Sequence, residues 1–171
     1  MADPSAPALR VEPLSDGHDR TEFTCGVDAL DRYVRVQAGQ DVRKRVATCF
    51  VLVAEGDPIP RGYYTLAATT IGLTDLPPAQ ARRLPRYPLV PATLMGRLAV
   101  ALAHRGQRLG ERLLLDALGR ALRSEIATFA FVVDAKDGIA AAFYARYGFL
   151  PLTPDRRRLF VPMAEVAKLF A

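Results

Sequence analysis

The segment Arg97–Glu111, RLAVALAHRGQRLGE, decides the fold of this chain. It begins as an apolar strand, passes through a short polar turn with Gly106 and Gly110, and continues into an amphipathic helix. Backbone N–H groups at such a turn, with the positive end of the helix, form an anion site that suits a pyrophosphate. Arg105 and Arg108 add positive charge there. The segment therefore predicts a phosphate-binding turn or, more simply, a connection whose glycines serve packing alone.

The pattern on both sides of this segment predicts a mixed α/β domain. Two apolar runs, 48–54 and 62–71, are joined by glycine and proline and favour an antiparallel hairpin. Five prolines between 75 and 91 exclude a long regular element there. The strand at 94–103 would place Leu98, Val100 and Leu102 on one face. We predict strands at 8–14, 48–54, 62–71, 94–103, 127–133, 149–152 and 159–163, and helices at 28–44, 109–123 and 138–147.

The composition fits a globular protein of one domain. The 171 residues are 50% hydrophobic and 24% charged. No apolar run approaches the roughly 20 residues of a membrane span. The N-terminus lacks the layout of a signal peptide, and residues 1–7 are small, include prolines and are expected to be disordered. We therefore expect one domain over residues 1–171, located in the cytoplasm and without membrane contact.

Several kinds of chemistry have little support in the residue types. Two cysteines, Cys25 and Cys49, cannot build a disulfide framework, and neither lies in a C-x-x-C pair. Only two histidines, His18 and His104, are present, so no metal site is expected. None of the three serines lies in a G-x-S-x-G turn, which argues against a serine hydrolase.

Arginine dominates the positive charge. The chain has 23 lysines and arginines against 18 acidic residues, for a net charge of +5, and only three of the 23 are lysines. The planar guanidinium suits phosphate groups, so the excess allows a nucleic acid or another phosphorylated partner. A GC-rich genome would produce the same bias without any such partner. Three clusters stand out: Arg43-Lys44-Arg45, Arg82-Arg83-Arg86 and Arg156-Arg157-Arg158.

A second motif follows one strand and one helix after the first. It reads Phe143-Tyr144-Ala145-Arg146-Tyr147-Gly148-Phe149, and the first reads Arg105-Gly106-Gln107-Arg108-Leu109-Gly110. Together they resemble the Gcn5-related N-acetyltransferase (GNAT) family, which carries a (Q/R)-x-x-G-x-(G/A) turn and a later F-Y-x-x-x-G-F segment. Arg108 stands where the family usually has glycine, and Ala101 where close relatives often have aspartate. The resemblance implies a mixed, mostly antiparallel sheet flanked by helices and splayed between its fourth and fifth strands, where acetyl-CoA binds.

Five further stretches are similar to one branch of that family, the acetyltransferase toxins of toxin–antitoxin operons. They are FTCG at 23–26 with LDRYV at 30–34, GYYTL at 62–66, RRLPRYP at 82–88, MGRLAV at 95–100 and LFVPM at 159–163. This resemblance implies acetylation of the α-amine of aminoacyl-tRNA, which blocks translation. It also implies a DNA-binding antitoxin as partner and a homodimer.

The resemblance assigns the general acid to Tyr144, which would protonate the coenzyme A thiolate. A phenol with a pKa of about 10 suits that role, because a thiol has a pKa of roughly 8.5. The alternative is an ordinary helix tyrosine, as we expect for Tyr147 in the core. Asp134 would position a water or cap the following turn, and His104 is expected to be a surface residue of the turn rather than a base. An α-amine is already partly neutral at pH 7, so no strong base is required.

The remaining site residues also follow from the resemblance. Backbone amides of the fourth strand would hold the thioester oxygen and the pantetheine arm, and the turn would hold the pyrophosphate. The two sets are Leu98, Ala99 and Val100, and Arg105, Gly106, Gln107, Arg108, Leu109 and Gly110. For tRNA we predict contacts with Arg43, Lys44, Arg45, Arg82, Arg83 and Arg86, provided that these clusters converge on one face. The cluster at 156–158 would alternatively bind an acidic segment of the antitoxin.

Two other functions stay open. One is a housekeeping N-acetyltransferase that modifies a small-molecule or protein amine. The other is a non-catalytic module that binds RNA or a repressor partner, in which Arg108 has abolished binding of acetyl-CoA.

Overall fold

The computed structural model describes residues 3–152 and 157–171. Its strands follow the order β1-β2-β3-β4-β5-β7-β6, with antiparallel pairs β1–β2, β2–β3, β5–β7 and β6–β7 and a parallel pair β4–β5. The mixed, mostly antiparallel sheet predicted from the sequence is therefore confirmed. The strands are β1 Leu9–Pro13, β2 Thr48–Ala54, β3 Gly62–Gly72, β4 Leu89–Val100, β5 Ala130–Asp134, β6 Leu150–Pro151 and β7 Arg158–Pro162.

The α-helices are α1 Asp28–Arg32, α2 Ala38–Arg43, α3 Pro78–Ala81, α4 Leu109–Arg123, α5 Gly138–Ala145 and α6 Met163–Leu169. Three single-turn elements, η1 Tyr33–Gln37, η2 Leu73–Asp75 and η3 Leu102–His104, complete the order. Contacts divide the chain into two compact units. Unit 1 comprises Met1–Leu66 and Arg97–Asp116, and unit 2 comprises Ala67–Gly96 and Ala117–Ala171. Strands β3 and β4 and helix α4 contribute residues to both units.

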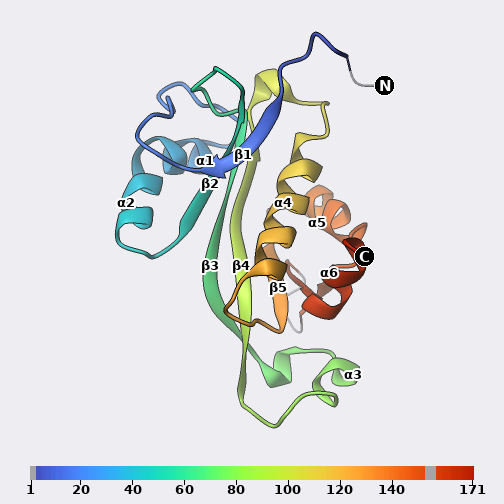
Figure 1. Cartoon of the computed structure of the whole chain (residues 1–171). Coiled ribbons are helices and arrows are strands. Elements are labelled where there is room, and N and C mark those ends of the chain that lie inside the picture. Colours follow the sequence, from blue (N-terminus) through green and yellow to red (C-terminus); the bar gives the residue numbers. More distant parts are fainter. Residues whose placement is uncertain (1–2, 153–156) are drawn as a thin grey trace. The chain divides into compact units, whose positions relative to one another are not determined.

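Unit 1 contains the predicted hairpin of β2 and β3. The two strands pair from Thr48 opposite Leu66 to Leu52 opposite Gly62, and β1 pairs with β2 on its other side. Helices α1 and α2 lie beside β1 and β2 (Figure 1). Their apolar side chains and those of the strands bury one core, formed by Phe23, Cys25, Tyr33, Val34, Ala38, Cys49, Val51, Val53, Tyr63 and Ala99. Both cysteines are buried thiols that take part in no disulfide.

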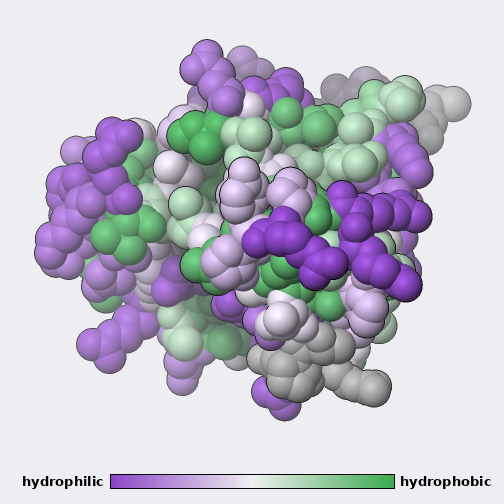
Figure 2. Space-filling model, turned by 90° about the horizontal axis from the view of Figure 1, so that it is seen from below, coloured by the Kyte–Doolittle hydropathy of each residue, from purple (hydrophilic) through white to green (hydrophobic). Residues whose placement is uncertain are grey.

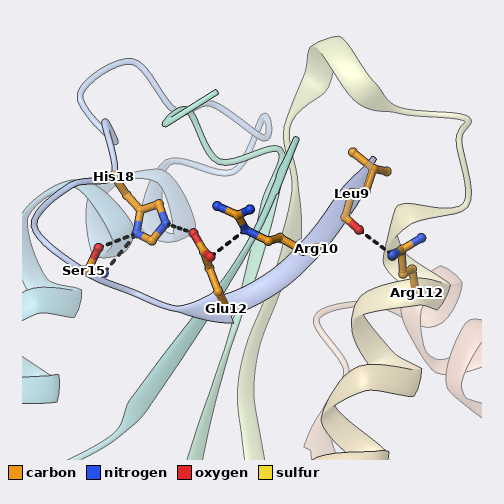
Figure 3. A network of polar contacts seen from close by, with 6 residues as sticks. All are labelled: Leu9, Arg10, Glu12, Ser15, His18 and Arg112. Atoms are coloured by element: carbon orange, nitrogen blue, oxygen red, sulfur yellow. Dashed lines mark hydrogen bonds and ion pairs between the residues drawn. The ribbon is translucent and has the colours of Figure 1, made fainter. Parts of the chain in front are cut away.

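The first strand is held by side chains as well as by its ladder (Figure 3). Arg112 Nη2 of α4 donates a hydrogen bond to the Leu9 carbonyl at 2.9 Å. Glu12 pairs with His18 at 2.7 Å and with Arg10 at 2.8 Å. The hydrogen bond with His18, which outweighs the effect of partial burial, lowers the pKa of the Glu12 carboxyl. These contacts attach β1 to the loop that follows it and to α4.

Gly62 permits a close approach between β3, β4 and α4. A Cβ atom on Gly62 would lie 2.8 Å from the Ala99 carbonyl oxygen and 2.8 Å from Leu113 Cδ1. Any larger residue would therefore push β3 away from β4 or displace α4. The lack of a side chain at Gly62 therefore lets β3 lie close to Ala99, the middle residue of the stretch Leu98–Val100.

Unit 2 contains the parallel pair and the C-terminal strands. Residues Ala92–Met95 of β4 pair with Ala130–Val133 of β5, and among the described residues the pairing extends no further. It ends three residues before Leu98, in agreement with the predicted splay. A second core is formed by Ile71, Leu76, Val90, Ala92, Ala130, Val132, Leu152 and Phe160.

The structure corrects several predicted boundaries. Strand β4 begins at Leu89, within the proline-rich stretch, and ends at Val100. Leu102 lies in a 3-10 turn with 42% of its surface exposed, so it does not share a strand face with Leu98 and Val100. Helix α6 was not predicted, because Val166 is its only buried residue and gives no periodic signal. No described helix is long and apolar enough to span a membrane.

Candidate active site

The predicted phosphate-binding turn lies in unit 1 between η3 and α4. Residues 105–108 are exposed, and α4 begins at Leu109, which is buried. Gly106 has a φ of +79°, and no atom lies within 4 Å of the place that a Cβ would take. An exposed turn with glycine, arginine side chains and the first N–H groups of a 15-residue helix suits an anionic group. The residues present therefore fit the pyrophosphate of acetyl-CoA.

Arg108 adopts a backbone conformation that explains why the family favours glycine at its position. Its φ is +58°, in the left-handed region that side chains with a Cβ rarely adopt. The side chain is 84% exposed and pairs with Glu111 at 3.3 Å on the first turn of α4. Arg108 therefore keeps the turn's shape and directs its side chain to solvent.

The strand before this turn supplies the predicted thioester-binding residues. Ala99 is buried in the core of unit 1, and Leu98 and Val100 are half-buried. The place of a Cβ on Gly110 lies 3.9 Å from Val100 Cγ2, which is ordinary packing contact between α4 and β4. The role of the Leu98–Val100 backbone in binding stays a prediction.

Tyr144 lies in unit 2 near the C-terminal end of α5. Asp137 caps this helix by accepting a hydrogen bond from the Ala140 N–H at 2.8 Å. The Tyr144 ring is 6% exposed and packs against Phe143 at 5.2 Å and Phe149 at 5.4 Å between ring centroids. Burial, followed by the negative charge of Asp134, raises the pKa of the Tyr144 phenol. The hydroxyl therefore keeps its proton at neutral pH, as a general acid must.

Two neighbours of Tyr144 differ from expectation. Tyr147 is half-buried rather than in the core, and its ring lies 5.4 Å from that of Phe143. Asp134 accepts two hydrogen bonds from Arg158, at 2.8 and 3.0 Å, across the β5–β7 ladder. The turn into α5 is capped by Asp137 instead, so Asp134 holds an arginine of the third cluster.

Comparisons with known proteins bear on these two motifs. A family model described as an acetyltransferase (GNAT) domain matches residues 45–151. This chain belongs to the GNAT family. It is 33% identical to the tRNA-acetylating toxin of Mycobacterium tuberculosis over 158 residues. The aligned region covers 91% of this chain and 93% of the relative. The recognition of an acetyltransferase toxin from the sequence is confirmed.

Solved structures agree with this assignment. AtaT complexed with acetyl-methionyl-tRNAfMet is 26% identical, with a TM-score of 0.88 over 96% of this chain and 100% of that chain. AtaTR bound with AcCoA is 25% identical, with a TM-score of 0.83 over 95% of this chain and 98% of that chain. The GNAT fold therefore extends over nearly the whole sequence.

His104 lies half-buried in η3, just before the predicted phosphate-binding turn. Burial and then the positive charge of Arg61 lower the pKa of its imidazole, against the smaller effect of Asp57. His104 is therefore neutral at pH 7 and adds no charge to the anion site.

The predicted tRNA-binding residues of this GNAT chain are all exposed but belong to different units. Arg43, Lys44 and Arg45 follow α2 in unit 1, and Arg82, Arg83 and Arg86 lie around α3 in unit 2. Within the described ranges, none of the six forms an ion pair with a carboxylate. Viewed from the α3 end, long hydrophilic side chains stand out from the surface (Figure 2). Convergence of the two clusters stays a prediction.

The third cluster is described only in part. Arg156 lies outside the described residues, and Arg158 pairs with Asp134. In the part of the chain that the structure describes, no group of three His, Cys, Asp or Glu side chains is arranged to hold a metal ion.

One buried polar residue, Asp31, was assigned no role from the sequence motifs. Asp31 is 5% exposed on α1 and accepts a hydrogen bond from the Cys25 N–H at 2.7 Å. The signal was present in the LDRYV stretch that resembles the toxin branch, but a motif match gives no contact.

Proposed function

We propose that this chain transfers the acetyl group of acetyl-CoA to the α-amine of aminoacyl-tRNA and thereby blocks translation as the toxin of a toxin–antitoxin pair. The observation that carries the proposal is the similarity of almost the whole chain to a tRNA-acetylating toxin. The buried, protonated Tyr144 and the exposed arginine-bearing turn supply the chemistry that such a reaction needs.

In this proposal, acetyl-CoA brings an activated acetyl thioester, and unit 1 binds its phosphates. N–H groups of the turn and of the first residues of α4 face the pyrophosphate, and Arg105 adds its charge. The backbone of Leu98, Ala99 and Val100 holds the thioester oxygen and the pantetheine arm. Arg108 contributes backbone rather than side chain, because its guanidinium pairs with Glu111.

Tyr144 acts as the general acid. The neutral α-amine attacks the acetyl carbon, the carbon–sulfur bond breaks, and Tyr144 donates its phenolic proton to the departing sulfur. The attacking nitrogen releases a proton, and the phenolate takes one up, so the enzyme returns to its starting state. No side chain has to remove the first proton, because the α-amine has a pKa of about 7.7–8.0 that its ester lowers further.

The remaining partners follow the resemblance. Six exposed cations would bind tRNA phosphates: Arg43, Lys44, Arg45, Arg82, Arg83 and Arg86. A DNA-binding antitoxin would neutralise the toxin in the cytoplasm. We also infer a homodimer, as is usual in the branch that the sequence resembles.

The test is transfer of labelled acetyl from acetyl-CoA to purified charged tRNA, with Tyr144→Phe and Tyr147→Phe in parallel. We expect label on the charged tRNA, a loss of about 100-fold or more in rate with Tyr144→Phe, and little change with Tyr147→Phe. Tyr147→Phe is the matched control because this substitution also removes a phenolic hydroxyl from the same motif.

Other results would favour the other functions. Transfer to small amines or proteins but not to charged tRNA would favour a housekeeping acetyltransferase. Absence of both transfer and acetyl-CoA binding would favour a non-catalytic module.

A further inference from the structure

The loop of residues 24–26 makes one contact with η3 and one with the cofactor turn, the exposed stretch 105–108 before α4. The Leu102 N–H donates a hydrogen bond to the Thr24 carbonyl at 2.9 Å. Arg105 Nη2 donates to the Cys25 carbonyl at 2.7 Å. These two bonds attach both ends of the segment Leu102–Arg105 to a loop that is distant in sequence. The guanidinium of Arg105 is therefore oriented by the chain itself.

Gly26 permits this contact. Its φ is +88°, and a Cβ there would lie 3.4 Å from Arg105 Nη2 and 3.4 Å from Leu102 Cδ2. An alanine would be strained in this conformation, and its Cβ would contact the side chains of Leu102 and Arg105 at the inner limit of ordinary packing distance. The loop thus needs glycine for its backbone, and a side chain at this position would touch Arg105.

Asp31 holds the same loop from the other side. Its Oδ1 accepts the Cys25 N–H at 2.7 Å, and its Oδ2 accepts the Thr24 hydroxyl at 3.2 Å. Burial raises the pKa of the Asp31 carboxyl, but these hydrogen bonds and the charge of Arg35 outweigh it and lower the pKa overall. At neutral pH a charged, buried carboxylate therefore fixes the two residues whose carbonyls contact the turn.

We propose that Asp31 is a positioning residue for acetyl-CoA: through the Thr24–Gly26 loop it holds Arg105 and the turn in their binding conformation. The inference rests on the proposed function, since it assumes that this turn binds acetyl-CoA. It gives a physical role to the FTCG and LD residues of the sequence. A turn that is held in place before binding loses less conformational entropy when acetyl-CoA binds. The protein therefore binds acetyl-CoA more tightly.

The experiment compares two glycine variants, Gly26→Ala and Gly56→Ala. Both positions lie in unit 1 with positive φ, but no atom lies within 4 Å of a Cβ on Gly56. The two variants therefore share the backbone strain and differ in the contact with Arg105. We expect Gly26→Ala to raise the Kd for acetyl-CoA about three- to tenfold, measured by calorimetry. Gly56→Ala should leave the Kd unchanged.

Two further variants address Asp31 itself. Asp31→Asn keeps the shape but offers one acceptor oxygen instead of two, and Thr24→Val removes only the hydroxyl. Amide hydrogen exchange of residues 105–110, without acetyl-CoA, should become faster in Gly26→Ala, Asp31→Asn and Thr24→Val. Thr24 is exposed, so its variant stays folded even where Asp31→Asn does not. The KM for acetyl-CoA should rise, while the KM for the acceptor stays constant.

The outcomes separate the two proposals. If Gly26→Ala matches Gly56→Ala in both Kd and exchange, the positioning role is wrong. If the parent protein binds no acetyl-CoA, the proposed function is wrong, and exchange of the turn still decides whether Asp31 holds it.

Discussion

Arg108 and Arg45 are the residues other than glycine that adopt positive φ in the described part of the chain, at +58° and +60°. A left-handed backbone costs a residue with a Cβ about 1–2 kcal/mol. Arg45 follows Lys44, the C-cap of α2, at the position where a left-handed residue commonly terminates a helix. Arg108 precedes α4 in the cofactor turn, so its strain is located where the ligand would bind.

Replacing Arg108 by glycine should stabilise the protein. Relief of the left-handed strain exceeds the added entropy of the unfolded chain, about 0.5–1 kcal/mol for glycine. The pair with Glu111 is exposed and contributes little. We expect a gain of about 0.5–1 kcal/mol in the free energy of unfolding, measured in urea. Arg45→Gly is the matched comparison and should gain similarly. A loss of stability with Arg108→Gly would show that the Glu111 pair matters more than the backbone.

Tyr144 determines how the reaction should depend on pH. Because burial raises the pKa of its phenol, the acid form persists into the alkaline range. The amine, in contrast, becomes reactive as it loses its proton near or below pH 8. We expect kcat/KM to rise through that region and then stay level, without a fall from loss of the acid. A pH profile with charged tRNA, corrected for ester hydrolysis, checks this. A fall between pH 8 and 9, where a free phenol is still protonated, would indicate a different acid.

At the scale of elements, α5 is short and depends on its cap. Asp137 accepts the Ala140 N–H at 2.8 Å, and the helix carries the Tyr144 ring, which packs against Phe143 and Phe149. A helix of eight residues is marginal without such end contacts. The cap therefore supports the position of Tyr144, the proposed general acid, as well as the helix.

Substituting the cap should loosen this helix. Asp137→Ala is expected to lower the free energy of unfolding by about 1 kcal/mol, whereas Asp137→Asn keeps an acceptor oxygen and nearly all of the stability. Chemical denaturation of both variants measures the difference. Equal loss in both would mean that the carboxylate charge, rather than the hydrogen bond, stabilises the helix.

The elements that the sequence predicted best have a long or uniform pattern. Helix α4 spans 109–123 and β2 spans 48–54, as expected, because each combines an unbroken apolar pattern with clear ends. The helical span expected over 28–44 was found over 28–43, but its middle, Tyr33–Gln37, is π-helical. Periodicity alone does not reveal that insertion. The start of β4 was also missed, because Pro88 and Pro91 argue against a strand that its partners nevertheless stabilise.

The site was predicted unevenly for a similar reason. The turn at 105–110 and Tyr144 were singled out because each lies in a short contiguous motif, and their roles stay predictions. Asp31 was not, because its contacts join residues that only the folded chain brings together. Arg82, Arg83 and Arg86 were predicted as tRNA contacts from their clustering in the proline-rich stretch; all three are exposed, and whether they bind tRNA is a matter for experiment.

For the whole molecule, a net charge of +5 carried mostly by arginine predicts salt-dependent binding of tRNA. Replacing Arg82, Arg83 and Arg86 by glutamine should weaken binding and reduce the slope of log K against log salt by about 2–3. Arg123→Gln, an exposed arginine at the end of α4, is the control and should leave the slope unchanged. Anisotropy titrations over a range of salt concentrations measure both. An unchanged slope in the triple variant would place the tRNA elsewhere.

The two buried cysteines have a practical consequence. Cys25 and Cys49 are 4% and 3% exposed, and burial raises the pKa of the Cys49 thiol to about 12. Neither should react with a maleimide dye while the protein is folded. A cysteine introduced at Ile139, which is 83% exposed on α5, would then be the one labelled position. The native cysteines would therefore add no fluorescent label of their own. A dye at position 139 would report on the helix that carries Tyr144.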